Sequence, residues 1–200
     1  MNTKNILGSV CSLRTEGGVS TAEEIARKSG VAPEEIGKVL NRMVKERLLE
    51  KRGREFQLTP EGRKKVKVVM IGGAFEIIHP GHIHTIREAK KLGDVLVVVV
   101  ATDMTVSKNK GRRPVTGEDL RVELVASIRY VDAAVLGGQG SIYDTLERVR
   151  PDIVALGYDQ SHREEEIERE AERRGLRVRV RRLNTPIPSV KTSRIVDQFA

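Results

Sequence analysis

The first 65 residues carry apolar positions at helical spacing, followed by two short runs separated by a glycine. The spacing predicts helices over residues 3–15, 20–30 and 33–47, and Pro33 suits the first turn of the third. Residues 48–58 predict two short strands joined through Gly53. We therefore expect a small N-terminal domain, residues 1–65, built from three helices and a hairpin.

From residue 66 the pattern changes to short, continuous apolar runs that alternate with helical stretches. The predicted strands cover residues 65–71, 95–101, 133–136, 153–156 and 176–180. The predicted helices lie at about residues 82–91, 117–129, 141–149 and 162–174. Alternating strands and helices favour parallel pairing with right-handed crossovers. We expect a doubly wound, Rossmann-like α/β domain over residues 66–200, with ligands at the carboxyl ends of its strands.

Composition is typical of a soluble protein of the cytoplasm. The single cysteine, Cys11, excludes an intrachain disulfide framework, and 38% hydrophobic residues suffice for a buried core. No apolar run reaches the roughly 18–20 residues that span a bilayer. Residues 1–4 also lack the apolar stretch of a secretory signal. We expect no membrane contact.

The net charge of +8 favours an anionic partner, either a nucleic acid or a polyphosphate. Residues 1–65 hold 14 basic and nine acidic side chains, whereas the rest of the chain holds 22 and 19. The positive charge is therefore concentrated in the N-terminal third.

Three helices followed by a basic hairpin resemble a winged helix-turn-helix domain. In such a domain the third helix enters the major groove of double-stranded DNA and the hairpin lies along phosphates. The side chains in position for these contacts are Lys38, Arg42 and Lys45 of the helix and Arg52 and Arg54 of the hairpin. The alternative is a domain used only for protein contacts.

A glycine-rich segment, residues 72–82, follows the first strand of the second domain and reads GGAFEIIHPGH. Glycines let the backbone approach phosphate oxygens closely, and the helix that begins near Gly81 directs its positive end to the same place. His79 and His82 lie three residues apart at that helix start, so both can face a bound phosphate. No cysteine lies near them, which disfavours a zinc site, and helix capping is the other alternative.

These features resemble the cytidylyltransferase-like nucleotidyltransferases, whose His-x-Gly-His motif matches His79 to His82 over a domain of about residues 66–198. The resemblance implies transfer of a nucleoside monophosphate from a nucleoside triphosphate to a phosphorylated acceptor, with release of pyrophosphate. It assigns transition-state stabilisation to His79, His82 and Lys110. It assigns nucleotide contacts to Gly72, Gly73, Ala74, Phe75, Gly81, Lys108, Asp159, Thr192, Ser193 and Arg194.

The resemblance also implies a magnesium ion held mainly by the triphosphate, no dedicated protein metal site, and a homodimer. Relatives commonly carry Thr, Ser or Cys at the position of Ala74 and Asp at the position of Glu76. This chain therefore lacks a possible hydroxyl contact at Ala74 and has its carboxylate on a longer side chain at Glu76. Glu118 and Arg121 match a recurring Glu-x-x-Arg spacing, and a structural role for Arg121 is as plausible as a catalytic one.

The branch of the family stays open. The Lys-Gly-Arg-Arg-Pro segment from Lys110 and the turn at residues 157–160 resemble archaeal FAD synthases, which transfer AMP from ATP to FMN. Against this, cysteines expected near the C-terminus are absent and aromatic residues are few. Residues 128–132 resemble CTP-dependent glycerol-3-phosphate cytidylyltransferases instead. A third hypothesis is a DNA-binding regulator that senses a nucleotide or flavin. FAD synthesis is the favoured prediction.

Overall fold

The computed structural model describes residues 3–138, 141–158, 160, 162–184, 192 and 195. The chain divides into two compact units, Met1–Lys67 and Val68–Ala200.

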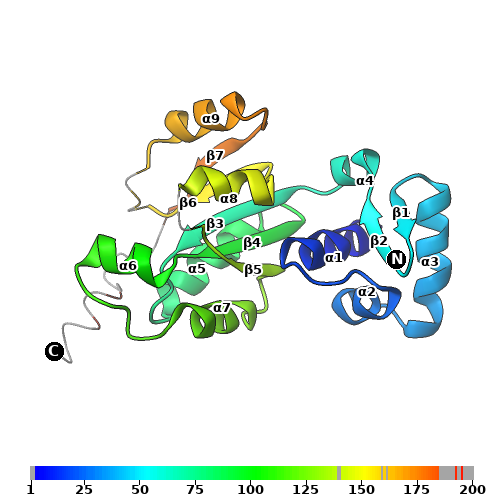
Figure 1. The fold of residues 1–200 in the computed structure, drawn as a ribbon, viewed down its shortest axis with the longest axis horizontal. Coiled ribbons are helices and arrows are strands. Elements are labelled where there is room, and N and C mark those ends of the chain that lie inside the picture. Colours follow the sequence, from blue (N-terminus) through cyan, green and yellow to red (C-terminus); the bar gives the residue numbers. More distant parts are fainter. Residues whose placement is uncertain are drawn as a thin grey trace. The chain divides into compact units, whose positions relative to one another are not determined.

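The first unit contains the three helices and the hairpin that the sequence predicts (Figure 1). Its elements are α1 (Thr3–Thr15), α2 (Ala22–Ser29), α3 (Pro33–Lys45), β1 (Leu49–Arg52), β2 (Glu55–Leu58) and the short α4 (Pro60–Lys64). The Thr21 side chain caps α2 by accepting a hydrogen bond from Glu24 N–H. Gly53 turns the antiparallel hairpin with φ of 62°, a conformation that favours glycine.

The core of the first unit joins all three helices to the hairpin. Its fully or almost fully buried side chains include Ile6, Leu7, Val10, Ile25, Ile36, Leu40, Met43, Leu49 and Phe56. The segment before α2 also pairs with β2, because Phe56 N–H donates to Ser20 O and the Ser20 hydroxyl donates to Phe56 O. The hairpin is therefore fixed to the helices by both packing and hydrogen bonds.

The second unit is a five-stranded parallel sheet in the order β5-β4-β3-β6-β7, as expected for the doubly wound α/β class. The strands are β3 (Val68–Gly73), β4 (Val95–Val100), β5 (Ala133–Leu136), β6 (Ile153–Leu156) and β7 (Arg179–Arg182). The helices are α5 (Pro80–Lys90), α6 (Asp103–Lys110), α7 (Glu118–Ala126), α8 (Ile142–Val149) and α9 (Glu164–Arg173). Figure 1 shows α8 and α9 on the opposite side of the sheet from α5 and α7.

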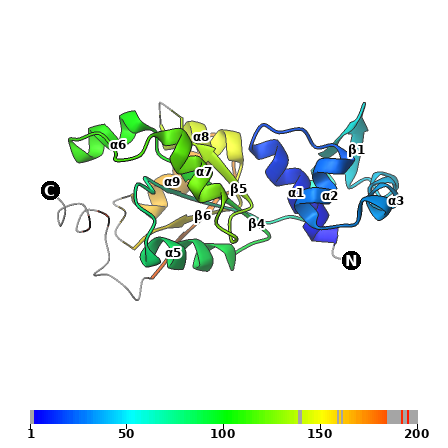
Figure 2. The same ribbon diagram turned by 90° about the horizontal axis from the view of Figure 1, so that it is seen from below.

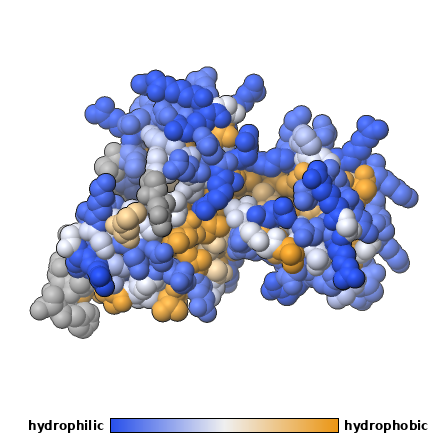
Figure 3. Space-filling model, viewed as in Figure 1, coloured by the Kyte–Doolittle hydropathy of each residue, from blue (hydrophilic) through white to orange (hydrophobic). Residues whose placement is uncertain are grey.

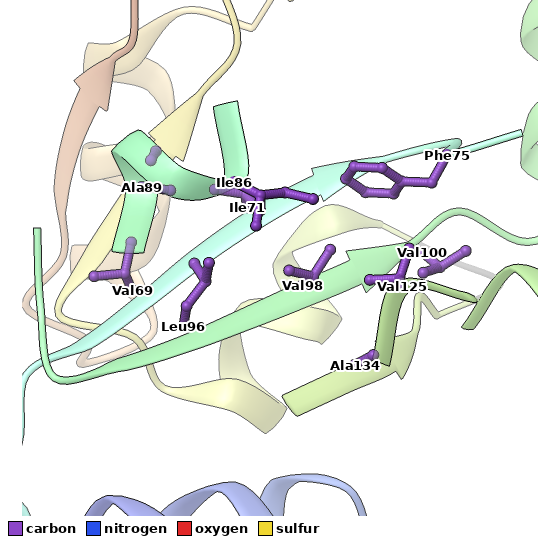
Figure 4. Close-up of a cluster of buried hydrophobic side chains, with 11 residues drawn as sticks. Val69, Ile71, Phe75, Ile86, Ala89, Leu96, Val98, Val100, Val125 and Ala134 are labelled. Atoms are coloured by element: carbon purple, nitrogen blue, oxygen red, sulfur yellow. The ribbon is translucent and has the colours of Figure 1, made fainter. Parts of the chain in front are cut away.

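One face of the sheet packs against α5 and α7 in a continuous apolar cluster (Figure 4). Ile86 and Ala89 of α5 and Val125 of α7 lie against alternate residues of the strands, which is the two-residue periodicity of a sheet face. Phe75 ends this row beyond β3, and its ring points back toward Ile71 (Figure 4). The core therefore extends to the carboxyl edge of the sheet.

Three elements differ from the prediction. The short helix α4, whose N-terminus Thr59 caps, lies outside the predicted helices. Helix α6 lies outside them as well. Thr102 caps it by accepting from Thr105 N–H, yet Val106 is its one buried residue, so no amphipathic pattern marks it. In both views α6 lies beyond the carboxyl end of the sheet (Figures 1 and 2). Strand β7 covers Arg179–Arg182 rather than residues 176–180, because Leu176 and Val178 are buried before the strand begins.

Candidate active site

The strand order reverses at β3, which pairs with β4 on one side and β6 on the other. Gly72 and Gly73 form the carboxyl end of β3 at this switch point, where open α/β sheets bind their ligands. Gln160, from the segment after β6, donates its side-chain amide to Gly72 O at 2.9 Å. This hydrogen bond joins the carboxyl end of β3 to the segment that follows β6, at the glycine-rich segment that the sequence predicts as the site.

The glycine-rich loop is held in one conformation by Phe75. Its backbone adopts φ of 48°, and its ring is buried. A Cβ atom at Gly73 would lie 2.9 Å from that ring, so glycine is required there for space. The predicted nucleotide contact of Phe75 is thus limited to its backbone, because the ring belongs to the core.

The two motif histidines lie together at the start of α5. His79 is the N-cap residue with extended backbone, and its ring stacks on that of His82 with centroids 3.8 Å apart. The Phe75 ring lies 5.2 Å from His82 on centroids. Both imidazoles therefore share one side of the helix start, where backbone N–H groups and the helix dipole also attract anions.

The His79 imidazole is partly buried at the start of α5. Burial lowers the pKa of His79 below its usual value, and within the described residues no group forms a hydrogen bond with its Nδ1 atom. The imidazole is therefore mostly neutral at pH 7, since the unperturbed pKa is about 6.5.

We predict that binding of a nucleoside triphosphate at this helix start takes up a proton at pH 7. The polyphosphate would stabilise the charged imidazole and raise the pKa of His79, so the affinity for the triphosphate should fall as pH rises through the new value. Calorimetric titrations in two buffers of different ionisation enthalpy measure the uptake. A His79→Gln variant should lose the buffer dependence, and its persistence there would contradict the assignment to His79.

Glu76 is the acidic centre of the loop, with a side chain that is 0% exposed. Its carboxylate accepts hydrogen bonds from Lys110 Nζ at 2.7 Å, from Arg112 at 2.6 and 3.2 Å, and from Val115 N–H at 2.9 Å. Burial raises the pKa of Glu76, but the bonds from Arg112, Lys110 and Val115 outweigh burial and lower it to about 2. Lys110, predicted to be catalytic, is thus anchored to the glycine-rich loop.

The depressed pKa of Glu76 predicts a pH dependence of stability. A carboxyl group with a pKa of 4.5 in the unfolded chain and about 2 when folded stabilises the fold above pH 4.5, and this is lost as pH falls toward 2. The loss amounts to about 3 kcal/mol. Urea unfolding from pH 5 to 2 should show the gap between wild type and Glu76→Gln shrinking by that amount, and a constant gap would contradict the prediction.

Arg121 has a structural role. The side chain is fully buried and donates to Thr116 O, to Ala74 O and to the Asp103 carboxylate. Glu118 accepts from Asp103 N–H at 2.6 Å and so caps the start of α6. The Glu-x-x-Arg spacing therefore fastens α6 and α7 to the glycine-rich loop.

The other residues that the sequence assigns to nucleotide binding are spread over α5, α6 and the C-terminal part of the chain. Lys108 is exposed on α6, and Gly81 lies in the first turn of α5. Thr192 is helical and half-buried. Asp159, Ser193 and Arg194 lie outside the described residues. Their assigned nucleotide contacts stay predictions.

Sequence reasoning missed Gln160 and Arg182 as organisers of the segment after β6. Arg182, in β7, donates to three carbonyl groups, those of Gly157, Gln160 and His162, and also to the Glu164 carboxylate. These contacts join residues about 20 apart in sequence, and no local pattern marks them.

Within the described ranges, no group of three or more His, Cys, Asp or Glu side chains is arranged to hold a metal ion. None of the helices found there has the length and apolar character needed to cross a bilayer.

Residues 70–198 match the family model described as Cytidylyltransferase-like, which covers most of the chain. The chain therefore belongs to the cytidylyltransferase-like family, and it is a nucleotidyltransferase.

Relatives within this family are similar over most of their own length. The FAD synthase of Aciduliprofundum boonei is 54% identical over 115 residues, which are 58% of this chain and 76% of the relative. The FAD synthase of Pyrococcus horikoshii is 44% identical over 139 residues, 68% of this chain and 93% of the relative. A crystal structure described as a lipopolysaccharide core biosynthesis protein, from Thermoplasma volcanium, shares 42% identity with a TM-score of 0.58, over 60% of this chain and 98% of that one.

Proposed function

We propose that the protein is an FMN adenylyltransferase, or FAD synthase, which transfers AMP from ATP to FMN and releases pyrophosphate. The observation that carries the proposal is the stacked pair His79 and His82 at the start of α5, beside the glycine-rich loop. The similarity to archaeal proteins named FAD synthase supports ATP as donor and a flavin phosphate as acceptor.

In this reaction a phosphate oxygen of FMN bonds to the α-phosphorus of ATP while the bond to the pyrophosphate oxygen breaks. Negative charge grows on the equatorial oxygens and on the leaving group. In this proposal that charge is stabilised by the imidazoles of His79 and His82, the N–H groups at the start of α5 and the ammonium of Lys110. The stacking of the two imidazoles at the helix start, and the bond from Lys110 to Glu76 of the glycine-rich loop, support these roles. Neither histidine acts as a nucleophile, because the acceptor phosphate supplies the attacking oxygen.

Magnesium enters with the nucleotide in this proposal. The site offers nitrogen donors and cations, and Glu76, its buried acid, is occupied by Lys110, Arg112 and Val115. Such a site suits an ion that is coordinated by phosphate oxygens and water and neutralises the triphosphate.

Transfer of an isotopic label tests the proposal. With ATP labelled at the α-phosphate, FMN and magnesium, the label should appear in FAD, whereas label at the γ-phosphate should appear in pyrophosphate. Label remaining in ATP after prolonged incubation with FMN would contradict FMN adenylylation.

We propose that residues 1–65 form a winged helix-turn-helix domain that binds double-stranded DNA. Lys38, Arg42 and Lys45 are all exposed on α3 at a spacing of four and three residues, so they share one helix face. Arg52 and Arg54 are exposed at the hairpin end.

Fluorescence anisotropy with duplex DNA at increasing salt tests this second function. Replacing Arg42 and Lys45 with alanine should weaken DNA binding and make the affinity less dependent on salt. The reason is that a protein with fewer phosphate contacts releases fewer counterions from DNA when it binds. Arg173→Ala, which removes an exposed arginine outside this unit, is the control. Equal binding by all three proteins, or none by any, would exclude DNA contact through α3.

We propose further that two copies associate through α7. Leu120 and Leu124 lie one turn apart on this helix and are 58% and 51% exposed. Figure 3 shows apolar surface in the region of α7, of the kind that protein contacts cover. Light scattering should give a dimer for wild type and for Val19→Glu, another exposed apolar position, and a monomer for the Leu120→Glu/Leu124→Glu variant. A wild-type monomer would exclude the dimer.

A further inference from the structure

The buried carboxylate of Glu76 accepts from Lys110, the residue whose ammonium is proposed to stabilise transition-state charge. Two cations, Lys110 and Arg112, converge on it from the end of α6. Val115 N–H adds a third donor to the same carboxylate. The segment from Lys110 to Val115 is therefore fastened to the glycine-rich loop through one side chain.

The charges of this cluster do not cancel. One carboxylate faces one ammonium and one guanidinium, which leaves an excess positive charge at the glycine-rich loop. The side chain of Lys110 is 31% exposed to solvent, whereas the side chain of Glu76 is fully buried. The ammonium therefore lies on the solvent side of the ion pair. An incoming phosphate can reach Lys110 without displacing Glu76.

The two cations differ in how firmly they are held. Arg112 donates through both terminal nitrogens, to both carboxylate oxygens, and its rigid planar group favours a fixed geometry. Lys110 donates to one carboxylate oxygen of Glu76 through a flexible stem that turns easily toward a second anion. The pair thus combines a fixed anchor with a mobile charge.

We propose that Glu76 is a positioning residue for nucleotidyl transfer. It holds Arg112 as a fixed anchor and holds Lys110 in reach of the phosphates, so that the Lys110 ammonium turns from the carboxylate to the triphosphate when ATP binds. The inference rests on the proposed function, and it gives the acidic position of the loop a role in the reaction that passes through Lys110.

A double-mutant cycle tests this role. The kcat of FAD formation is measured for wild type, Glu76→Gln, Lys110→Met and the double variant, and is normalised to the folded fraction from circular dichroism. Glu76→Gln should lower kcat by about 100-fold, the cost of misplacing a catalytic group by about 1 Å. In the Lys110→Met background the same change should cost only about twofold, because the group that Glu76 positions is gone.

Equal fold-losses in the two backgrounds would overturn the inference, since Glu76 would then act independently of Lys110. Glu168→Gln is the control, because the Glu168 carboxylate also accepts a backbone N–H, that of Val180, away from the glycine-rich loop. If Glu76→Gln does not fold, Glu76→Asp, which keeps the charge on a shorter arm, takes its place in the cycle. A wild-type protein that makes no FAD would overturn the proposed function itself, whereas active wild type with equal losses overturns this inference alone.

Discussion

Replacing His82 with alanine is expected to lower kcat for FAD formation by about 10³-fold, the typical cost of losing one fixed donor to transition-state charge. The ring of His82 stacks on that of His79 with centroids 3.8 Å apart at the start of α5, which is where the proposed function has the phosphates bind. Steady-state kinetics with ATP and FMN measure the loss. The KM for ATP should change much less than kcat, because charge grows mainly in the transition state.

His84→Ala is the matched control, because it removes the same side chain from the same helix. His84 contacts Arg87 on α5 and belongs to no part of the proposed site. Its kcat should remain within about twofold of wild type, as for surface changes away from a site. Comparable losses in both variants would mean that the His82 effect reflects disturbance of α5 rather than contact with phosphate.

Replacing Arg121 with methionine is expected to reduce the free energy of unfolding by about 2–4 kcal/mol, since a buried acceptor left without its donor costs about 1–3 kcal/mol. The Asp103 carboxylate adds little to this loss, because its side chain is 44% exposed. A methionine side chain fills part of the volume of the buried arginine but donates no hydrogen bond. The carbonyl groups of Ala74 and Thr116 and the carboxylate of Asp103 then lose their donor. Urea unfolding followed by circular dichroism measures the change.

The matched control is Arg173→Met, which breaks an exposed pair with Glu170 on α9. Exposed pairs contribute at most about 1 kcal/mol, so this variant should unfold almost as wild type does. A loss at Arg121 no larger than at Arg173 would refute the structural role of Arg121 and return it to the list of catalytic candidates.

Sequence patterns predicted the architecture of the second unit well, since the four strands β3 to β6 are short apolar runs between helices. The parallel sheet and its five strands follow from that alternation, whereas the strand order, which reverses at β3, comes from the structure alone. Helix α6 escaped prediction because a helix with one buried residue, Val106, shows no apolar face. The start of β7 was misplaced because Leu176 and Val178 are buried outside the strand.

The site was predictable where its residues are close in sequence. His79 and His82 lie three residues apart, so the helix start alone brings them together. Glu76 meets Lys110 across 34 residues and Gln160 meets Gly72 across 88, and such contacts follow from the fold rather than from any local pattern. The same limit applies to Phe75, a candidate for nucleotide contact whose ring proved to be buried in the core.

The measurement that tests the central claim most directly is pyrophosphate release in four mixtures with magnesium. ATP or CTP is combined with FMN or glycerol-3-phosphate, and His82→Ala serves as the inactive reference. The account predicts release with ATP and FMN alone. Release with CTP and glycerol-3-phosphate alone would contradict it and place the protein in the cytidylyltransferase branch, and silence in all four would favour a nucleotide-sensing regulator.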